Sequence, residues 1–303
     1  MKDISLKPSN VHMGITDKCN LRCLHCDIWR NTKRQELASG QWIIILKKIR
    51  EWLGPFRLDI SGGEPFLRDD IIDIIDFCDK NEIKLLVTTN GTLLNPGIIS
   101  ILSRIKSLTL NISMDGVNPD THDYLRNVKG VQQKIMDALL EFKKNNRSCH
   151  ITMATILMVY NIEEAMALLK KLMVDNLADA INFQALDHNF GADYNEVWFK
   201  ENKLWPSEDK KEDFLNILGS IIRIKKAGGP IHNPVGQLEL MKRYFNNPLQ
   251  SVKMKCNTGN INFIMNPSGE VLLCWNMASI GNMLRSYPEK IWNSRLAKER
   301  KED

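Results

Sequence analysis

Six short β-prone runs occupy residues 11–185, and a segment of helical character follows each of the first five within this range. We predict strands at 11–16, 56–61, 83–89, 108–113, within 151–159 and at 181–185, and helices at 39–52, 69–80, 96–105, 131–144 and 162–174. Crossover connections of this length join parallel strands. The alternation therefore predicts an α/β fold in which a parallel sheet curls into a partial (β/α)6 barrel.

The C-terminal part of the chain interrupts this alternation. A further helix is predicted at 208–226, and Gly228-Gly229-Pro230 then marks a domain boundary. Beyond it, runs at 261–265 and 270–274 flank a turn at 266–269, which predicts a β-hairpin. We therefore expect a core at 1–228 and a small α+β extension, hairpin plus helix, at 229–303. The chain ends inside a charged helix, at 298–303, which is compatible with a truncated extension.

Unusual residue groups follow the first four predicted strands. They are the segment Cys19–Cys26, Gly62-Gly63-Glu64-Pro65, Thr89-Asn90-Gly91 and Ser113-Met114-Asp115-Gly116. Parallel α/β sheets place their active sites at the carboxyl ends of the strands, so these groups are expected to meet at one cavity. The two glycines would allow close approach of the backbone to a ligand and leave amides free to donate.

Cys19, Cys23 and Cys26 form a C-x3-C-x2-C pattern in a segment short enough to surround one inorganic centre. Three thiolates suit an iron–sulfur cluster or another soft metal. Three cysteines on a [4Fe–4S] cube leave one iron open to a small ligand. A disulfide is disfavoured, because the triplet is odd and no secretory signal precedes it. A Cys3His zinc site that recruits His25 is the alternative.

The cysteine triplet, His25 before its last member and the three later motifs resemble the radical S-adenosylmethionine (SAM) enzymes. The resemblance covers about residues 10–185 and, more loosely, 250–295. It implies a TIM-like partial barrel that holds SAM and a [4Fe–4S] cluster on Cys19, Cys23 and Cys26. The residues expected to contact SAM are His25, Gly62, Gly63, Glu64, Asn90, Ser113, Asp115 and Arg126.

The resemblance also implies a role for several of these residues. Glu64 meets the amino end of SAM, His25 stacks on the adenine, Arg126 pairs with the carboxylate, and Ser113 and Asp115 contact the ribose or the substrate. Plain turns remain the alternative for Asn90 and Asp115, and a surface salt bridge remains the alternative for Arg126.

The implied activity is reductive cleavage of SAM to a 5′-deoxyadenosyl radical that abstracts hydrogen from a substrate. The outcome would be oxidation, epimerisation or cross-linking, with flavodoxin or ferredoxin as the low-potential electron donor. A first strand near Val11 leaves no room for an N-terminal peptide-recognition domain. This favours a small, carbohydrate-like substrate, or a peptide delivered by a separate protein. A non-catalytic iron–sulfur scaffold or redox sensor is the alternative function.

Cys256 and Cys274 form a C-x12-G-x4-C pattern that resembles the start of a SPASM or twitch auxiliary-cluster domain. No cysteine follows Cys274, so two readings stay open: further ligands lie beyond the chain, or the pair belongs to a structural hairpin. Without a second cluster, either thiol could donate hydrogen to a substrate radical, and a buried inert thiol is the alternative.

Charge and hydrophobicity limit the classes of partner and the cellular location that we expect for this chain. The net charge of +5 is mild and Lys and Arg are dispersed, which gives no support to nucleic-acid binding. No apolar run is long enough to span a membrane, and no signal peptide is evident, so a cytoplasmic protein is expected.

Cys78 and Cys149 are expected to be inert core thiols. Residues 187–206 are either a substrate lid or a surface loop fixed by Trp198 and Trp205.

Overall fold

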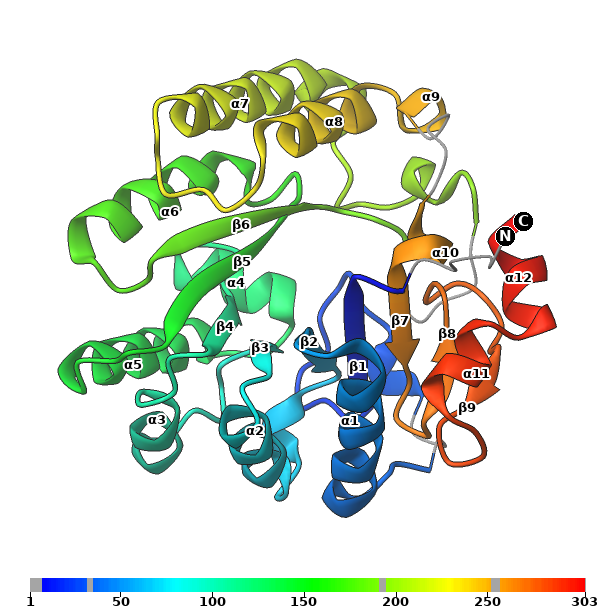
Figure 1. Cartoon of the computed structure of the whole chain (residues 1–303). Helices are drawn as coiled ribbons and strands as arrows, with labels where there is room; N and C mark the ends of the chain where they lie inside the picture. The colour runs from blue at the N-terminus through cyan, green and yellow to red at the C-terminus, as the bar shows by residue number, and fades with distance from the viewer. Residues whose placement is uncertain (1–6, 32–34, 191–194, 252–256, 303) are drawn as a thin grey trace. The chain divides into compact units, whose positions relative to one another are not determined.

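The structure is a computed structural model that describes residues 7–31, 35–190, 195–251 and 257–302 (Figure 1). The chain forms two compact units. Unit 1 comprises residues 1–20, 28–89 and 255–303, and unit 2 comprises residues 21–27 and 90–254. Within the described ranges, none of the helices has the length and apolar character needed to cross a membrane.

Unit 1 contains a mixed sheet with strand order β3-β2-β1-β7-β8-β9. Its strands are β1 (Asn10–Thr16), β2 (Arg57–Gly62), β3 (Lys84–Thr89), β7 (Asn262–Met265), β8 (Glu270–Leu272) and β9 (Gly281–Asn282). The pairs β1–β2, β2–β3 and β1–β7 are parallel, whereas β7–β8 and β8–β9 are antiparallel. The predicted C-terminal hairpin is therefore present, and it extends the same sheet beside β1.

Two amphipathic helices accompany the first strands of unit 1, α1 (Ser39–Leu53) and α2 (Ile71–Lys80) (Figure 1). Each buries residues at the spacing i, i+3, i+4 and i+7, the pattern of one helix face. These residues are Trp42, Ile45, Leu46 and Ile49 in α1, and Ile71, Ile74, Ile75 and Cys78 in α2. Buried strand residues such as Met13, Ile60 and Val87 complete the core.

The remaining elements of unit 1 are short, namely η1 (Ile28–Arg30), η2 (Pro65–Leu67), α10 (Thr258–Ile261), α11 (Pro288–Trp292) and α12 (Arg295–Glu302). An aromatic cluster joins α1, β7 and α11. The Trp52 ring lies 5.8 Å from Phe263 and 6.4 Å from Trp292, centroid to centroid. The C-terminal hairpin and helix are thus packed against the elements that surround β1.

Unit 2 continues the β–α alternation with the strand order β4-β5-β6, all parallel. Its elements are α3 (Pro96–Leu102), β4 (Leu108–Ser113), α4 (Pro119–Arg126), α5 (Val131–Lys144), β5 (His150–Leu157), α6 (Ile162–Asp175), β6 (Ala180–Ala185), η3 (Trp198–Lys200), α7 (Glu208–Lys226), α8 (Val235–Asn246) and α9 (Pro248–Ser251). Figure 1 shows α7 beside α8. Each predicted strand and helix is present, with ends displaced by three residues at most, as at the end of α3. In this unit the structure adds α4, α8 and the short α9, which the sequence did not predict.

At the edge of β6, the side chain of Asn233 makes hydrogen bonds of the kind that a neighbouring strand would make. Its buried amide accepts a hydrogen bond from Phe183 N at 2.7 Å and donates to Phe183 O at 2.8 Å. We expect Asn233→Leu to lower the free energy of unfolding by about 2 kcal/mol, because both backbone groups lose their partner. Urea unfolding measures this. Asn216→Ala, at an exposed site of α7, is the control, and an equal loss there would contradict the assignment.

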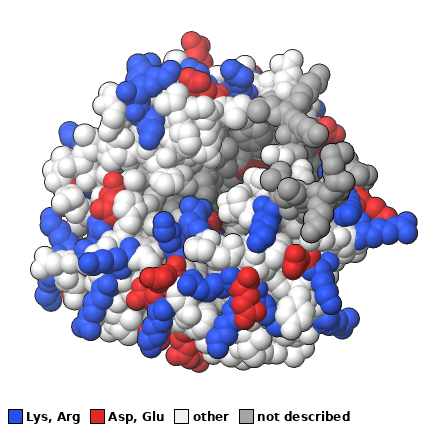
Figure 2. Space-filling view, in the orientation of Figure 1, with Lys and Arg blue, Asp and Glu red and all other residues white. Residues whose placement is uncertain are grey.

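Charged side chains of both signs are visible on one face of the molecule. On the face that Figure 2 shows, Lys and Arg are interspersed with Asp and Glu and do not gather into one basic patch. The dispersal expected from the sequence is therefore seen on this face.

Candidate functional site

The segment that leads into the cysteine loop packs directly on the glycine motif in unit 1. Gly63 N donates to Thr16 O at 2.7 Å, and Glu64 N donates to Lys18 O at 2.8 Å. A Cβ atom on Gly62 would lie 2.3 Å from Thr16 O, and one on Gly63 would lie 2.1 Å from Lys18 O. The glycines therefore permit contact between two backbones. The expectation that amides would be free here is wrong for Gly63 and Glu64.

Glu64 links this loop to the end of β3. Its carboxylate is fully buried, and Oε1 accepts hydrogen bonds from Phe66 N at 3.0 Å and from Thr89 Oγ1 at 2.8 Å. These bonds fix the side chain at the carboxyl ends of β2 and β3. Contact between Glu64 and the amino group of SAM stays a prediction.

The three cysteines are half-buried, with Cys19 in unit 1 and Cys23 and Cys26 in unit 2. The middle of the loop is attached to the end of α4. Leu24 N donates to Leu125 O at 3.0 Å, and the neighbouring Arg126 Nη1 donates to Cys23 Sγ at 3.8 Å. Across the part of the chain that the structure describes, no group of three or more His, Cys, Asp or Glu side chains has the arrangement of a metal site.

The residue after Cys26 is attached to the segment that follows β6. Asp27 N donates to Phe190 O at 2.9 Å, and Asp27 Oδ2 accepts a hydrogen bond from Asn189 Nδ2 at 2.9 Å. The first residues of the predicted lid, 187–190, therefore contact the cysteine loop directly.

The later part of that segment is held by aromatic contacts. The Trp205 ring stacks on Phe245 of α8 with centroids 4.9 Å apart, and its centroid lies 5.4 Å from that of Trp198. Leu204 O accepts a hydrogen bond from Val159 N at 2.9 Å. The fixing role expected of the two tryptophans is thus present, and a lid function stays a prediction.

A buried ion pair lies beside Cys23. Arg126 Nη2 is 2.7 Å from Asp115 Oδ2, with side-chain exposures of 8% and 0%. Asp115 Oδ1 also accepts a hydrogen bond from Ile156 N at 3.1 Å. Burial raises the pKa of Asp115, although Arg126 opposes the shift. Burial alone would lower the pKa of Arg126, but Asp115 and Cys23 outweigh it and keep the guanidinium charged. The surface salt bridge considered for Arg126 is excluded.

Two histidines adjoin this pair. His122 Nδ1 accepts a hydrogen bond from Asp115 N at 3.0 Å, so the proton of the neutral ring is on Nε2. Burial and the charge of Arg126 hold the pKa of His122 well below its ordinary value. Burial, followed by Arg126, lowers the pKa of His25 to about 3. Both imidazoles are therefore neutral at physiological pH.

Buried nitrogens near Cys23 lack hydrogen-bond partners within the described part of the chain. They are His25 Nδ1, His122 Nε2 and Arg126 Nε. Buried polar groups are normally paired, and a missing ligand is one common reason why they are not. An acceptor-rich anionic group held by the neighbouring thiolates would satisfy the N–H groups of Arg126 Nε and His122 Nε2, and also His25 Nδ1 in the tautomer that protonates this nitrogen. The residues present therefore fit an iron–sulfur cluster with a bound polar ligand.

The neutral state of His122 makes stability sensitive to acid. Its folded pKa lies below the value of 6.5 in the unfolded chain, so its contribution is complete above pH 6.5 and declines as the pH falls. We expect about 2 kcal/mol of unfolding free energy to be lost through this group between about pH 7 and pH 5. His122→Asn, which keeps an acceptor for Asp115 N, should remove that loss. Urea unfolding of the cluster-free protein tests this, and parallel pH profiles for the two proteins would contradict it.

Asn90 and Ser113 are the remaining residues that are expected, from the resemblance, to contact SAM. Asn90 Oδ1 accepts hydrogen bonds from Thr92 N at 3.0 Å and Thr92 Oγ1 at 2.7 Å, the arrangement of a side-chain-stabilised turn. Ser113 ends β4 and pairs in register with Ala154. Contact of Asn90 and Ser113 with SAM stays a prediction.

The remaining cysteines divide into two groups. Cys78 and Cys149 are buried, and burial raises their pKa to about 12 and about 11, as expected for inert thiols. Cys274 is half-buried just beyond β8. Its neighbour Trp275 packs on β1, where a Cβ on Gly14 would lie 2.8 Å from the indole. Cys256 lies outside the described residues, so the auxiliary cluster and the hydrogen-donor role stay predictions.

Sequence reasoning did not single out His122, Arg68 or Glu36. Arg68 and Asp70 form an Arg-x-Asp pattern just after Gly62-Gly63-Glu64-Pro65, and that adjacency is a sequence feature that could have drawn attention to the pair. His122 lies on α4, which was itself not predicted.

Comparison with known protein families identifies the family to which this chain belongs. The model of the radical SAM superfamily matches residues 13–172, more than half of the chain. The chain belongs to the radical SAM superfamily. The cofactors of this family are a [4Fe–4S] cluster and SAM, as the cysteine triplet and the motifs at the strand ends predicted.

Curated relatives match less than half of this radical SAM protein. A probable GTP 3′,8-cyclase of Methanothermobacter thermautotrophicus is 33% identical over 144 residues, which are 45% of this chain and 47% of the relative. The subtilosin biosynthesis protein AlbA of Bacillus subtilis is 32% identical over 127 residues, 41% of this chain and 28% of AlbA. The aligned regions cover less than half the length of either relative.

Solved structures extend the likeness to nearly the whole chain. SuiB of Streptococcus suis bound to SAM superposes with a TM-score of 0.74 at 16% identity, over 97% of this chain and 68% of SuiB. SuiB bound to its precursor peptide SuiA gives the same TM-score at 17% identity, over 98% and 67%. This likeness confirms the predicted fold class, a partial TIM-like barrel with additional C-terminal strands and helices.

Proposed function

We propose that this protein reductively cleaves SAM and uses the product radical to abstract hydrogen from a substrate. The observation that carries the proposal is the set of unpartnered buried nitrogens of His25, His122 and Arg126 beside Cys23. When bound and reduced, the cluster supplies the electron that splits SAM into methionine and a 5′-deoxyadenosyl radical. Donors that neighbouring chain atoms leave unsatisfied are suited to holding an anionic ligand in a water-poor site.

Cys19, Cys23 and Cys26 would hold the cluster, and Arg126 would donate to the sulfur of Cys23. Asp115 orients Arg126, because its carboxylate is buried and bound to Ile156 N. The groups that we propose to contact SAM are those at the strand ends, namely His25, Gly62, Gly63, Glu64, Asn90, Ser113, Asp115 and Arg126. Two of the guanidinium nitrogens already contact Asp115 and Cys23, so a SAM carboxylate would meet Arg126 at Nε.

We propose a peptide substrate. SuiB, whose fold matches nearly the whole chain, has been crystallised with a precursor peptide, and AlbA is a bacteriocin biosynthesis protein. The segment after β6 contacts Asp27 directly, which would bring a substrate held there close to the cluster loop. GTP, named in the cyclase relative, is the small-molecule comparator.

We also propose that residues 1–228 form the radical SAM core and that residues 229–303 form an auxiliary extension. We further propose that the protein is cytoplasmic and that flavodoxin or ferredoxin supplies the electron. Cys274 and Cys256 would contribute to a second cluster only with further ligands, because two thiolates hold part of a cluster at best.

The test uses anaerobically reconstituted protein. Iron and sulfide are counted, and 5′-deoxyadenosine is measured after dithionite reduction with SAM, with a Cys19/Cys23/Cys26 triple alanine variant as the blank. We expect about four irons per chain from one cluster, and about eight would indicate a second. Iron without SAM cleavage would favour the scaffold alternative, and bound zinc would overturn the proposal. Turnover of GTP would contradict the peptide assignment.

A further inference from the structure

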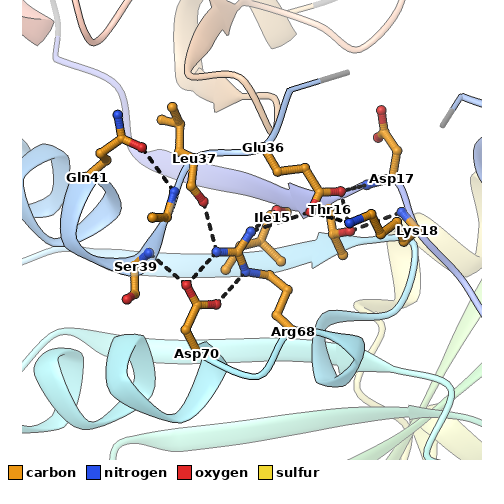
Figure 3. Close-up of polar contacts among 11 residues, drawn as sticks. Ile15, Thr16, Asp17, Lys18, Glu36, Leu37, Ser39, Gln41, Arg68 and Asp70 are labelled. Atoms are coloured by element: carbon orange, nitrogen blue, oxygen red, sulfur yellow. Dashed lines mark hydrogen bonds and ion pairs between the residues drawn. The ribbon is translucent and has the colours of Figure 1, made fainter. Parts of the chain in front are cut away.

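A second charged network, partly buried, lies in unit 1, outside the residues assigned to the cofactors (Figure 3). At its centre is Arg68, whose side chain is 9% exposed. Nε and Nη2 donate to the two oxygens of Asp70, each at 2.8 Å, and Nη2 also donates to Leu37 O at 2.8 Å. Nη1 donates to Ile15 O at 3.3 Å and lies 3.6 Å from Glu36 Oε2. One guanidinium therefore joins the loop after β2 to β1 and to the segment before α1.

Glu36 carries this connection to the residues that precede Cys19. Its Oε1 accepts hydrogen bonds from Thr16 Oγ1 at 2.7 Å and from Asp17 N at 3.3 Å. Its Oε2 lies 3.8 Å from Lys18 Nζ. Lys18 N in turn donates to Thr16 Oγ1 at 3.0 Å. The carboxylate thus contacts each of the three residues before the first cysteine.

Residues 16–18 are bound on a second side by the glycine motif. Their carbonyl groups accept hydrogen bonds from Gly63 N and Glu64 N, whereas their amide and side-chain groups bind Glu36. Arg68 follows that motif in the chain and contacts Glu36 itself. The end of β1 and the glycine motif are therefore connected twice, once through the backbone and once through Arg68 and Glu36.

Asp70 keeps Arg68 in place and extends the network to α1. Its Oδ2 accepts a hydrogen bond from Ser39 N, at the first residue of α1, at 2.8 Å. Burial opposes ionisation of Asp70, but the bonds from Arg68 and Ser39 outweigh it, so its pKa lies below the ordinary value. Asp70 is therefore ionised at physiological pH.

A gain in folding stability does not by itself explain why the charged side chains of this network are partly buried. A buried ion pair is often no more stabilising than apolar residues of the same volume, whereas a satisfied polar network fixes one arrangement of the segments that it joins. The same Arg-x-Asp pattern occurs on β2, where Arg57 binds both oxygens of Asp59 with 53% of the arginine side chain exposed. Asp59 also lies 3.5 Å from His12 Nδ1 on β1, but the two hydrogen bonds from Arg57 to Asp59 stay within β2, which makes Arg57 a matched comparison for Arg68.

We propose that Arg68 and Glu36 are positioning residues that hold residues 16–18, and with them Cys19, at a fixed place against the Gly63–Glu64 backbone. Neither touches the reacting atoms; both act through Thr16, Asp17 and Lys18. The inference rests on the proposed function, because it assigns to this network the task of keeping a cluster ligand in register with the glycine motif.

The test compares Arg68→Lys, Glu36→Ala and Glu36→Gln with wild-type protein. The variants are reconstituted, and iron release to a chelator is followed together with the change in the electron paramagnetic resonance spectrum of the reduced cluster when SAM is added. We expect Arg68→Lys and Glu36→Ala to release iron about ten- to a hundredfold faster, as is usual when residues that orient metal ligands are removed. Glu36→Gln, which keeps acceptors for Thr16 and Asp17, should restore much of the retention and the spectral response.

Two controls separate positioning from general stability. Arg57→Lys changes the matched exposed pair, and Ile74→Val weakens the core of α2 by about 1 kcal/mol. Both should release iron at the wild-type rate. Equal acceleration in either control would overturn the proposal. If Arg68→Lys does not fold, the comparison of Glu36→Ala with Glu36→Gln decides the question.

The outcomes also distinguish this inference from the proposed function. Wild-type protein that binds iron and cleaves SAM, with variants that match it in iron release and spectrum, would refute the positioning role alone. Wild-type protein that binds no iron–sulfur cluster would refute the proposed function, and the positioning role with it.

Discussion

Asp115→Asn is expected to lower the free energy of unfolding of the cluster-free protein by about 3–5 kcal/mol, the usual cost of leaving one member of a buried ion pair without its partner. The asparagine keeps an acceptor for Ile156 N and fills the same space, so the change removes little besides the charge. Arg126 would then be a buried cation with no counter-ion 2.7 Å away. Urea unfolding at neutral pH in the presence of reductant measures the effect.

Two further variants identify the cause. The double variant Asp115→Asn/Arg126→Met removes both charges and should recover most of the loss, because no unpaired charge remains buried. Asp76→Asn breaks an exposed pair on α2, in which Lys80 is 2.6 Å away and the side chains are 71% and 54% exposed. That change should cost about 0.5 kcal/mol at most. A cost this small for Asp115→Asn would show that Asp115 and Arg126 are not a charged pair in the folded protein.

The stability of this pair matters for the proposed chemistry. Cys23 and Asp115 contact the two terminal nitrogens of the same Arg126 guanidinium, so loss of the Asp115 charge is expected to weaken the contact with Cys23. Asp115→Asn is therefore expected to impair cluster binding as well as folding.

The regular elements were predictable because their buried faces repeat. The helix at 131–144 and the strand at 108–113 have the bounds given by their apolar periodicity. The helix α4 was not predicted, because it buries the polar His122 and Arg126 beside Leu125 and so lacks an apolar stripe. The helix α8 buries Leu238, Met241 and Phe245 at helical spacing, but the sequence indicated only a domain boundary, at Gly228-Gly229-Pro230, ahead of it.

The candidate site was predictable at the level of motifs and not at the level of contacts. Residue groups after successive parallel strands must lie at one end of those strands, so the positions of Glu64 and Asp115 followed from the alternation. Their partners did not follow. Glu64 binds Thr89, and Arg68 binds the backbone of Leu37, and these contacts depend on side-chain directions that no spacing encodes.

Gly63→Ala is expected to lower the rate of SAM-dependent 5′-deoxyadenosine formation by about a hundredfold, the scale of loss that follows a displacement of about 1 Å in an active site. The added Cβ would lie 2.1 Å from Lys18 O, a backbone atom that can move only with the cysteine loop. The glycine motif and residues 16–18 must therefore separate, which breaks the hydrogen bonds of Gly63 N and Glu64 N. Overpacking of this kind should also cost about 1–3 kcal/mol of stability.

Gly40→Ala is the matched control, because a Cβ at this position in α1 meets no atom within 4 Å. It should raise stability by about 0.5–1 kcal/mol through helix propensity and leave SAM cleavage unchanged. Iron content and unfolding are measured alongside the rate, so a Gly63→Ala protein that binds iron and yet cleaves SAM slowly would localise the defect to the loop contact. Cleavage by Gly63→Ala at the wild-type rate would show instead that this backbone contact relaxes without disturbing the site, and that the glycines are required only by the local turn.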